Sequence, residues 1–226
     1  MIVTFDLFSA LTDSRRGASA LLAEIARERG WAQDGEELYA AWDGHNKALQ
    51  RTATPPTTFH DLSREALVRA YADLGLSGSG DVDADLARIE ESVADWPLWP
   101  DVEAGVASVV RDHRVGILSN VDDALARRTR AYPLVDPDLV LTSQRLGAYK
   151  PSPELYAAAA AAAAPDRLVH VAASGRDVRG ALEAGLATVR LVRDGHVVDT
   201  AGPQPGVEVT DAADLAEAVE RVAAQA

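Results

Sequence analysis

Strand-like and helix-like segments alternate along residues 98–226, and this alternation restricts the possible folds more than any other feature. Short apolar runs such as Val115–Leu118 are each followed by a longer stretch in which apolar residues recur at helical spacing. Strands that are separated by helices need crossover connections, and these place the strands parallel in one sheet. We therefore predict an α/β fold with a parallel sheet at its core and helices on both faces.

The first predicted strand, Ile2–Phe5, stands apart from the others, because residues 14–97 have only a helical pattern. We expect residues 1–13 and 98–226 to form a Rossmann-like core domain and residues 14–97 to form an inserted helical cap domain. The other strands are expected at Val115–Leu118, Leu139–Leu141, Leu168–Ala172, Thr188–Val192 and Val207–Val209. The helices are expected at Ala18–Trp31, Glu36–Gln50, from Asp61 or Ser63 to Leu74, Asp83–Ala94, Val102–Asp112, Asp123–Ala131, Pro153–Ala164, Val178–Ala184 and Asp211–Ala224.

The composition argues against several classes of function. The 35 acidic residues outnumber the 22 basic ones, which gives a formal net charge of −13. A nucleic-acid or anionic-membrane partner would need clustered positive charge, so we expect a small-molecule substrate instead. The absence of cysteine excludes disulfides, thiol nucleophiles and cysteine-ligated metals. No secretory pattern and no apolar run of membrane-spanning length is found, which predicts a cytoplasmic location.

Polar side chains follow four of the predicted strands. Because ligands bind at the carboxyl ends of parallel strands, we expect these side chains to meet in one cleft. They are Asp6, Ser119, Asn120, Lys150, Ser174 and Asp177. Each one alone has an ordinary explanation as a turn or capping residue. Together, two carboxylates, an ammonium group, and hydroxyl and amide donors are typical of a nucleophile with electrostatic support.

The order of these segments resembles the four motifs of the haloacid dehalogenase superfamily. The segments are FDLFSALTD at 5–13, ILSN at 117–120, YKP at 149–151 and VHVAASGRD at 169–177. The resemblance spans the whole chain. It implies a hydrolase in which Asp6 is the nucleophile and the helical insert is a cap domain.

Two positions differ from the phosphatases of this superfamily. Phosphatases carry a general-acid Asp where this chain has Phe8, and a magnesium-binding Gly-Asp pair where it has Ala172 and Ala173. Phenylalanine cannot protonate a leaving group, and alanine offers no side-chain oxygen to a hard cation. Both features resemble the L-2-haloacid dehalogenase branch, which has an aromatic residue at the first position and uses no metal or other cofactor.

The third motif adds to this similarity, because Tyr149, Lys150, Pro151 and Tyr156 match that branch. The resemblance implies a two-step reaction. The Asp6 carboxylate displaces halide from the carbon beside the substrate carboxylate, and water then hydrolyses the resulting ester. A halide leaves without being protonated, so this chemistry needs no acid at the position of Phe8.

The resemblance also implies a role for each site residue. Lys150 and Ser119 would keep Asp6 ionised and oriented, and Asp177 would pair with Lys150 and help to position or activate the water. The expected substrate-binding residues are Phe8, Ser9, Asn120, Tyr156, Ser174, Trp42 and His45. A metal, if one bound, would be held by Asp6, the Phe8 carbonyl and Asp177.

The chain departs from the dehalogenase pattern at three places. Ser9-Ala10 stands where Gly-Thr is usual, and Ala172 and Ser174 stand where Ser and Asn are expected. The early cap helix usually supplies an arginine for the substrate carboxylate, but residues 39–47 contain none. Possible replacements are His45, Asn46, Lys47, Arg15 and Arg16. Candidates for shaping a pocket for a larger or less charged substrate are Tyr39, Trp42, Trp96 and Trp99.

Two other functions stay open on the sequence alone. An atypical magnesium-dependent phosphatase of the same fold would show magnesium-stimulated phosphate release. A non-catalytic binding protein is favoured by the altered first and fourth motifs, whereas the retained Asp6, Ser119, Lys150 and Asp177 favour an enzyme. A homodimer formed through the cap is compatible with the resemblance.

Overall fold

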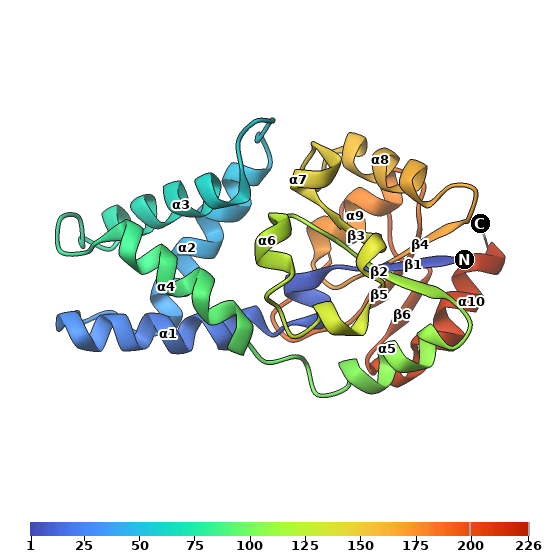
Figure 1. Cartoon of the computed structure of the whole chain (residues 1–226), viewed down its shortest axis with the longest axis horizontal. Coiled ribbons are helices and arrows are strands. Elements are labelled where there is room, and N and C mark those ends of the chain that lie inside the picture. Colours follow the sequence, from blue (N-terminus) through green and yellow to red (C-terminus); the bar gives the residue numbers. More distant parts are fainter. Residues whose placement is uncertain (199, 226) are drawn as a thin grey trace.

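A six-stranded parallel sheet forms the centre of the computed structural model, which describes residues 1–198 and 200–225 (Figure 1). The strand order is β3-β2-β1-β4-β5-β6. The strands are β1 (Ile2–Phe5), β2 (Arg114–Ser119), β3 (Val140–Thr142), β4 (Leu168–Ala172), β5 (Ala187–Leu191) and β6 (Val207–Val209). The α/β fold class predicted from the alternation is confirmed. Residues 199 and 226 of the predicted core range lie outside the described residues.

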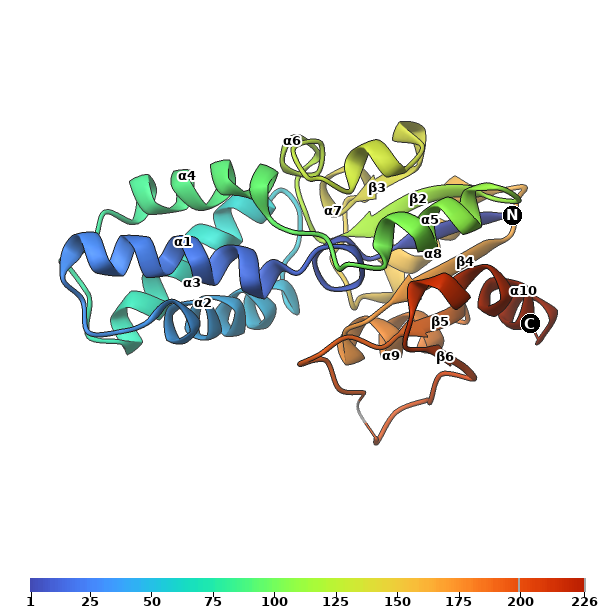
Figure 2. The same ribbon diagram turned by 90° about the horizontal axis from the view of Figure 1, so that it is seen from below.

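Helices cover both faces of this sheet (Figures 1 and 2). On one face α5 (Val102–Val110) packs beside α10 (Leu215–Gln225), and on the other α8 (Pro153–Ala163) packs beside α9 (Gly175–Glu183). The alanine-rich α8 buries Ala159 and Ala163 in a cluster with strand residues. Small side chains let this helix lie close to the sheet, and it ends before Pro165, which cannot continue it.

Four further helices are inserted between β1 and β2 and form a bundle at one end of the core (Figure 2). They are α1 (Ser14–Arg29), α2 (Gly35–Gln50), α3 (Phe59–Asp73) and α4 (Val82–Ser92). Their apolar interior contains Leu22, Ile25, Leu38, Leu67, Leu86 and Ile89. This bundle is the predicted cap-like insertion, while the boundaries at 14 and 97 stay predictions.

Local hydrogen bonds move several helix starts away from the predicted positions. The helix α3 begins at Phe59, two residues before the nearest predicted start. The reason is a capping box formed by Thr58 and Asp61. The helix α1 begins at Ser14, because the side chain of Asp13 accepts a hydrogen bond from the backbone N–H of Arg16. Capping side chains, more than apolar periodicity, therefore set these ends.

The segment after β2 contains the largest error in the predicted helices. The helix α6 covers only Asp123–Ala126, whereas a helix to residue 131 was predicted. The backbone N–H and the hydroxyl of Thr129 both donate to the Ala126 carbonyl, and this local bonding competes with helix continuation. A short helix, α7 (Ser143–Leu146), was not predicted; it ends at Gly147, whose φ is 68°.

The central position of β1 determines where the functional residues can lie. Phe5 pairs with Ile117 of β2 on one side and with Val171 of β4 on the other. The residues that follow these three strands therefore emerge side by side at the end of the sheet that faces the cap. Within residues 1–198 and 200–225, none of the helices has the length and hydrophobicity needed to cross a bilayer.

Candidate active site

Asp6 leaves the central strand and begins a single turn of π-helix, Leu7–Leu11. Its Oδ2 accepts a hydrogen bond of 3.0 Å from the backbone N–H of Ser9, and it also accepts one from the Ser9 hydroxyl. Ser9 was the expected substitute for the hydroxyl that Ala10 lacks, and its position fits that substitution. The chain that follows β1 thus fixes one oxygen of Asp6 through local contacts alone.

The Lys150 ammonium group lies between two buried carboxylates. Its Nζ is 3.0 Å from Oδ1 of Asp6 and 2.6 Å from Oδ2 of Asp177. The Ser119 hydroxyl donates to Oδ1 of Asp6 at 3.3 Å. The four residues predicted to be catalytic therefore come together in one connected cluster. Removing the shared cation would leave two unpaired charges in a buried place, which is costly.

Asp177 has further partners that the sequence analysis did not assign to it. The Tyr156 hydroxyl donates to its Oδ1 at 2.8 Å, and Nε2 of His170 lies 3.2 Å from both of its oxygens. Nδ1 of His170 is 3.1 Å from the Thr4 hydroxyl and 3.2 Å from the Thr4 carbonyl. A histidine within the apolar strand VHVA at 169–172 was the available signal for this contact.

The charges of this cluster shift the pKa of both carboxyl groups. Burial opposes the ionisation of Asp6, but Lys150 and the Ser9 hydrogen bond together outweigh it, and the pKa of Asp6 falls below its ordinary value. Burial also opposes the ionisation of Asp177, while Lys150 and His170 hold the pKa of that carboxyl well below its usual range. Asp177 is therefore a fixed anion. This favours a positioning role and disfavours the expected alternative of accepting a proton from water.

A cavity of about 110 Å³, partly open to solvent, lies between the sheet and the cap. The charged cluster forms its inner end, and both aromatic and polar side chains line the rest. Phe8 lies between Phe59 and Trp96, with ring centroids 6.2 and 5.8 Å away. Tyr39 also lines the cavity, whereas Trp99 is not a lining residue and instead donates from its indole to the Ser9 carbonyl at 3.1 Å.

The structure brings most of the predicted substrate-binding residues to this cavity. Those that line it are Phe8, Ser9, Trp42, Asn120 and Ser174. Two predicted residues lie outside its wall. Tyr156 is fully buried, and its hydroxyl contacts the Asp177 carboxylate. His45 is bound 2.7 Å from Asp73 of α3 and is not part of the cavity wall.

The candidates for the missing cap arginine are mostly engaged elsewhere. Arg15 forms an exposed ion pair with Glu36 at 2.5 Å, and it lines, with Arg16, a separate surface groove. Asn46 lines the cavity but donates to the Ser63 hydroxyl at 3.1 Å. Lys47 also lines the cavity; it is 2.5 Å from Asp43.

Arg176 is the lining residue that the sequence analysis missed. It is the second residue of α9, and its guanidinium group crosses to the cap. Nη1 donates to the Lys47 carbonyl and Nη2 to Oε1 of Gln50, both at 2.9 Å. Its place directly before Asp177 in the fourth motif was a signal, because that position leaves the sheet at the same end.

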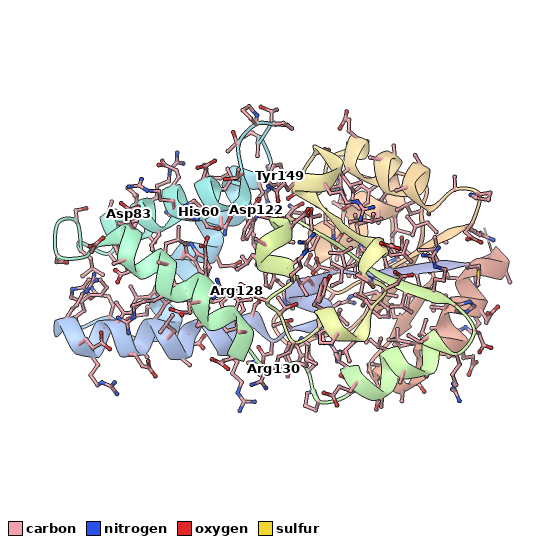
Figure 3. All side chains as sticks on the ribbon, viewed as in Figure 1. His60, Asp83, Asp122, Arg128, Arg130 and Tyr149 are labelled. Atoms are coloured by element: carbon pink, nitrogen blue, oxygen red, sulfur yellow. The ribbon has the colours of Figure 1, made fainter. Side chains whose placement is uncertain are left out.

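Three more side chains of the core form hydrogen bonds with the cap. The side-chain amide of Asn120 donates to Gln50 at 2.9 Å, and the Tyr149 hydroxyl donates to the Thr57 carbonyl at 2.8 Å. The Asp122 carboxylate accepts from the backbone N–H groups of Phe59 and His60 at 3.0 and 2.9 Å. Figure 3 shows Asp122 and Tyr149 on the core side of this seam and His60 on the cap side.

A metal ligand set is not formed by these residues. Among the residues that the structure describes, no three His, Cys, Asp or Glu side chains are grouped to hold an ion. The ammonium group of Lys150 lies between Asp6 and Asp177, and the Phe8 carbonyl accepts a hydrogen bond of 2.6 Å from the Ser14 hydroxyl. The three ligands considered for magnesium therefore do not fit a hard cation, which requires open oxygen donors.

A family model for haloacid dehalogenase-like hydrolases matches residues 1–185. The chain belongs to this family. The superfamily resemblance deduced from the four motifs is thereby confirmed. No curated protein matches the sequence.

Solved structures of haloacid dehalogenases share the whole fold of this family member. The defluorinating L-2-haloacid dehalogenase Rha0230 is 24% identical, with a TM-score of 0.81 over 97% of this chain and 94% of that one. The L-2-haloacid dehalogenase PA0810 is 26% identical, with a TM-score of 0.79 over 99% and 98%. The L-2-haloacid dehalogenase from Xanthobacter autotrophicus with chloropropionic acid covalently bound is 22% identical, with a TM-score of 0.79 over 97% and 98%.

Proposed function

We propose that this hydrolase cleaves the carbon–halogen bond of a 2-halo carboxylic acid through a covalent ester on Asp6, without a metal. The observation that carries the proposal is the ion cluster at the inner end of the cavity. Lys150 and Ser9 hold the Asp6 carboxylate ionised and oriented, as a nucleophile requires. The apolar Phe8 beside it suits a leaving group that departs as an anion.

The first step forms a bond between a carboxylate oxygen of Asp6 and the carbon that carries the halogen. The carbon–halogen bond breaks, and the halide leaves with its electron pair. In the second step water adds to Cγ of Asp6, the bond from Cγ to the ester oxygen breaks, and a 2-hydroxy acid leaves while one proton passes to solvent. Asp177, which accepts hydrogen bonds from Lys150, Tyr156 and His170, keeps Lys150 in place through both steps.

The likeness to known structures supports this choice of substrate. The similar solved structures described above are L-2-haloacid dehalogenases, and one of them holds chloropropionic acid covalently. Full coverage in both directions means that the cap and the core of those proteins both have counterparts here. We therefore extend the substrate class of those proteins, a 2-haloacid, to this one.

Halide release from L-2-chloropropionate, with and without chelator, tests the proposal. We expect turnover by the native protein and a loss of roughly 10⁴-fold or more in Asp6→Asn, because the nucleophile is gone. Asp138→Asn is a matched control at an exposed carboxylate that lies outside the cavity wall. A single turnover in ¹⁸O-labelled water should place the label in Asp6 and not in the first product.

The opposite results each have a definite meaning. Full activity of Asp6→Asn would contradict the covalent route. No halide release, with phosphate release from p-nitrophenyl phosphate that requires magnesium, would replace the proposal with the phosphatase alternative. No turnover of either substrate would leave the non-catalytic binding protein as the better description.

A further inference from the structure

Arg176 is a cation in the cavity wall for which the proposed reaction has no use so far. Its two hydrogen-bond acceptors, the Lys47 carbonyl and the Gln50 side-chain oxygen, are both uncharged. Within the described part of the chain, its guanidinium group forms no ion pair. A guanidinium group has five N–H donors, so donors remain for a ligand in the cavity.

The other cations of the cavity are already neutralised. Lys47 is 2.5 Å from Asp43, and Lys150 is shared by Asp6 and Asp177. Burial lowers the pKa of Arg176, although the carboxylates of Asp177 and Asp6 act in the opposite direction. An arginine side chain nevertheless stays protonated at neutral pH. A partly buried cation with only neutral partners gains a charge-assisted bond when an anion arrives.

A second pocket on the outside of the molecule shares this residue. Arg176 lines it together with Arg51 and Arg179, at the start of α9. Nε of Arg179 is 2.7 Å from the Glu183 carboxylate. Among the described residues, Arg51 forms no ion pair with a carboxylate. Arg176 thus lies beside two further guanidinium groups, one of which Glu183 neutralises, in a chain with a net charge of −13. Nearby guanidinium groups favour an anionic ligand at Arg176.

We propose that Arg176 binds the carboxylate group of the substrate, so that a residue of the core recognises the acid. The apolar part of the substrate then lies against the aromatic wall that includes Trp42, Phe59 and Trp96. The inference rests on the proposed function for the identity of the reacting carbon, which is bound to this carboxylate and faces Asp6. It defines the substrate class as an organic acid with an apolar substituent.

Binding measurements test this role separately from catalysis. Tryptophan fluorescence, reported by Trp42 and Trp96 in the cavity wall, would follow the binding of L-2-chloropropionate and of the neutral 2-chloropropionamide to Asp6→Asn. Adding Arg176→Gln should weaken binding of the acid roughly tenfold to a hundredfold and leave binding of the amide unchanged. In the active enzyme the same change should raise KM for the acid more than it lowers kcat.

Two further variants keep the test decisive. Arg145→Gln is the matched control, because Arg145 also donates to neutral carbonyl oxygens, those of Asp138 and Val140, but lies outside the cavity wall. We expect it to bind both ligands normally. If Arg176→Gln loses both ligands, Arg176→Lys decides. Acid binding restored by the lysine supports a charge role, and no restoration overturns the proposal.

The results also separate this inference from the proposed function. Unchanged acid binding in Arg176→Gln would overturn the inference even in a protein that releases halide. Acid binding that requires Arg176, in a protein that releases no halide, would support the anion site and count against the dehalogenase reaction instead.

Discussion

The core wall and the cap wall of the cavity differ in chemistry. The core contributes Asp6, Lys150 and Asp177, and each of these has at least two polar partners. The cap contributes apolar side chains such as Trp42 and Phe59, together with polar ones such as Asn46 and the Lys47–Asp43 ion pair. This difference leads us to propose that bond breaking belongs to the core, whereas the cap selects the shape of the substrate.

The two walls also differ in how they are held. Asp6 directly follows a hydrogen-bonded parallel strand, whose register leaves little freedom, and ion pairs join Lys150 to it and Asp177 to Lys150. The cap residues project from helices that pack through apolar side chains, and such packing tolerates replacement by residues of similar volume. We therefore expect changes in the core wall to alter kcat and stability, and changes in the cap wall to alter KM.

The largest effect is expected from Lys150→Met. The variant buries two carboxylates without a cation, so the free energy of unfolding at pH 8 should fall by about 3–5 kcal/mol. Urea denaturation measures this loss. Turnover should also fall sharply, because Asp6 is then ionised only at a cost.

The pH dependence of this variant sharpens the prediction. In the native protein the lowered pKa values of Asp6 and Asp177 contribute stability above the unfolded pKa of about 3.9, and this stability is lost as pH falls through the folded values. Without Lys150 we expect both folded pKa values to rise, and burial should carry that of Asp6 above the unfolded value, so stability is lost as pH rises through it. The gap between variant and native protein should narrow from pH 8 to pH 4.5, and a constant gap would refute the explanation.

A smaller effect is expected from Tyr156→Phe. The variant loses the 2.8 Å hydrogen bond to Asp177, and stability should fall by about 1–2 kcal/mol. Because Tyr156 lies behind the cavity, kcat should decrease while KM for L-2-chloropropionate stays constant. Steady-state kinetics provide the check, and a selective rise in KM would mean that Tyr156 reaches the substrate after all.

The cap wall is tested by Trp42→Phe. This change removes the indole donor that bonds to the Ser63 carbonyl at 3.0 Å and reduces the aromatic surface of the cavity. KM should rise roughly tenfold for 2-chloro-2-phenylacetate and less for L-2-chloropropionate, with kcat nearly unchanged. Equal effects on both substrates would contradict a shape-selecting cap.

The smallest effect is expected at the outer surface of the cap. Arg64 and Asp83 form an exposed ion pair with an Nε–Oδ1 distance of 2.6 Å, and Figure 3 labels Asp83. Water screens such pairs, so Arg64→Gln should leave thermal unfolding and kinetics unchanged within error. A clear loss of activity would show that the cap wall is coupled to its far side.

The sequence predicted the parts of the site that strand geometry determines. Asp6, Ser119, Lys150 and Asp177 meet because parallel strands end at one edge of the sheet, and that rule needs no side-chain coordinates. The direction of a side chain on a helix depends on tertiary packing. For this reason spacing alone could not predict that Tyr156 of α8 contacts Asp177 or that the Arg176 guanidinium group reaches the cap.

The same limit applies to local structure. The apolar runs located all six strands within about two residues, because burial on both faces leaves a strong signal. The π-turn at 7–11 has no such signal, although it places Ser9 on Asp6. The end of α6 was also missed, because it depends on hydrogen bonds of a single side chain, that of Thr129.

The carboxylate of Asp122 has a consequence for the motion of the molecule. It satisfies the first two N–H groups of α3, while Thr58 satisfies the third, so the start of this cap helix is completed by the core. Each separation of the two domains must therefore return two amide protons to water. Deuterium uptake at the backbone amides of Phe59 and His60 would then measure how often the cap separates from the core. Ligands that favour the closed arrangement would slow this uptake.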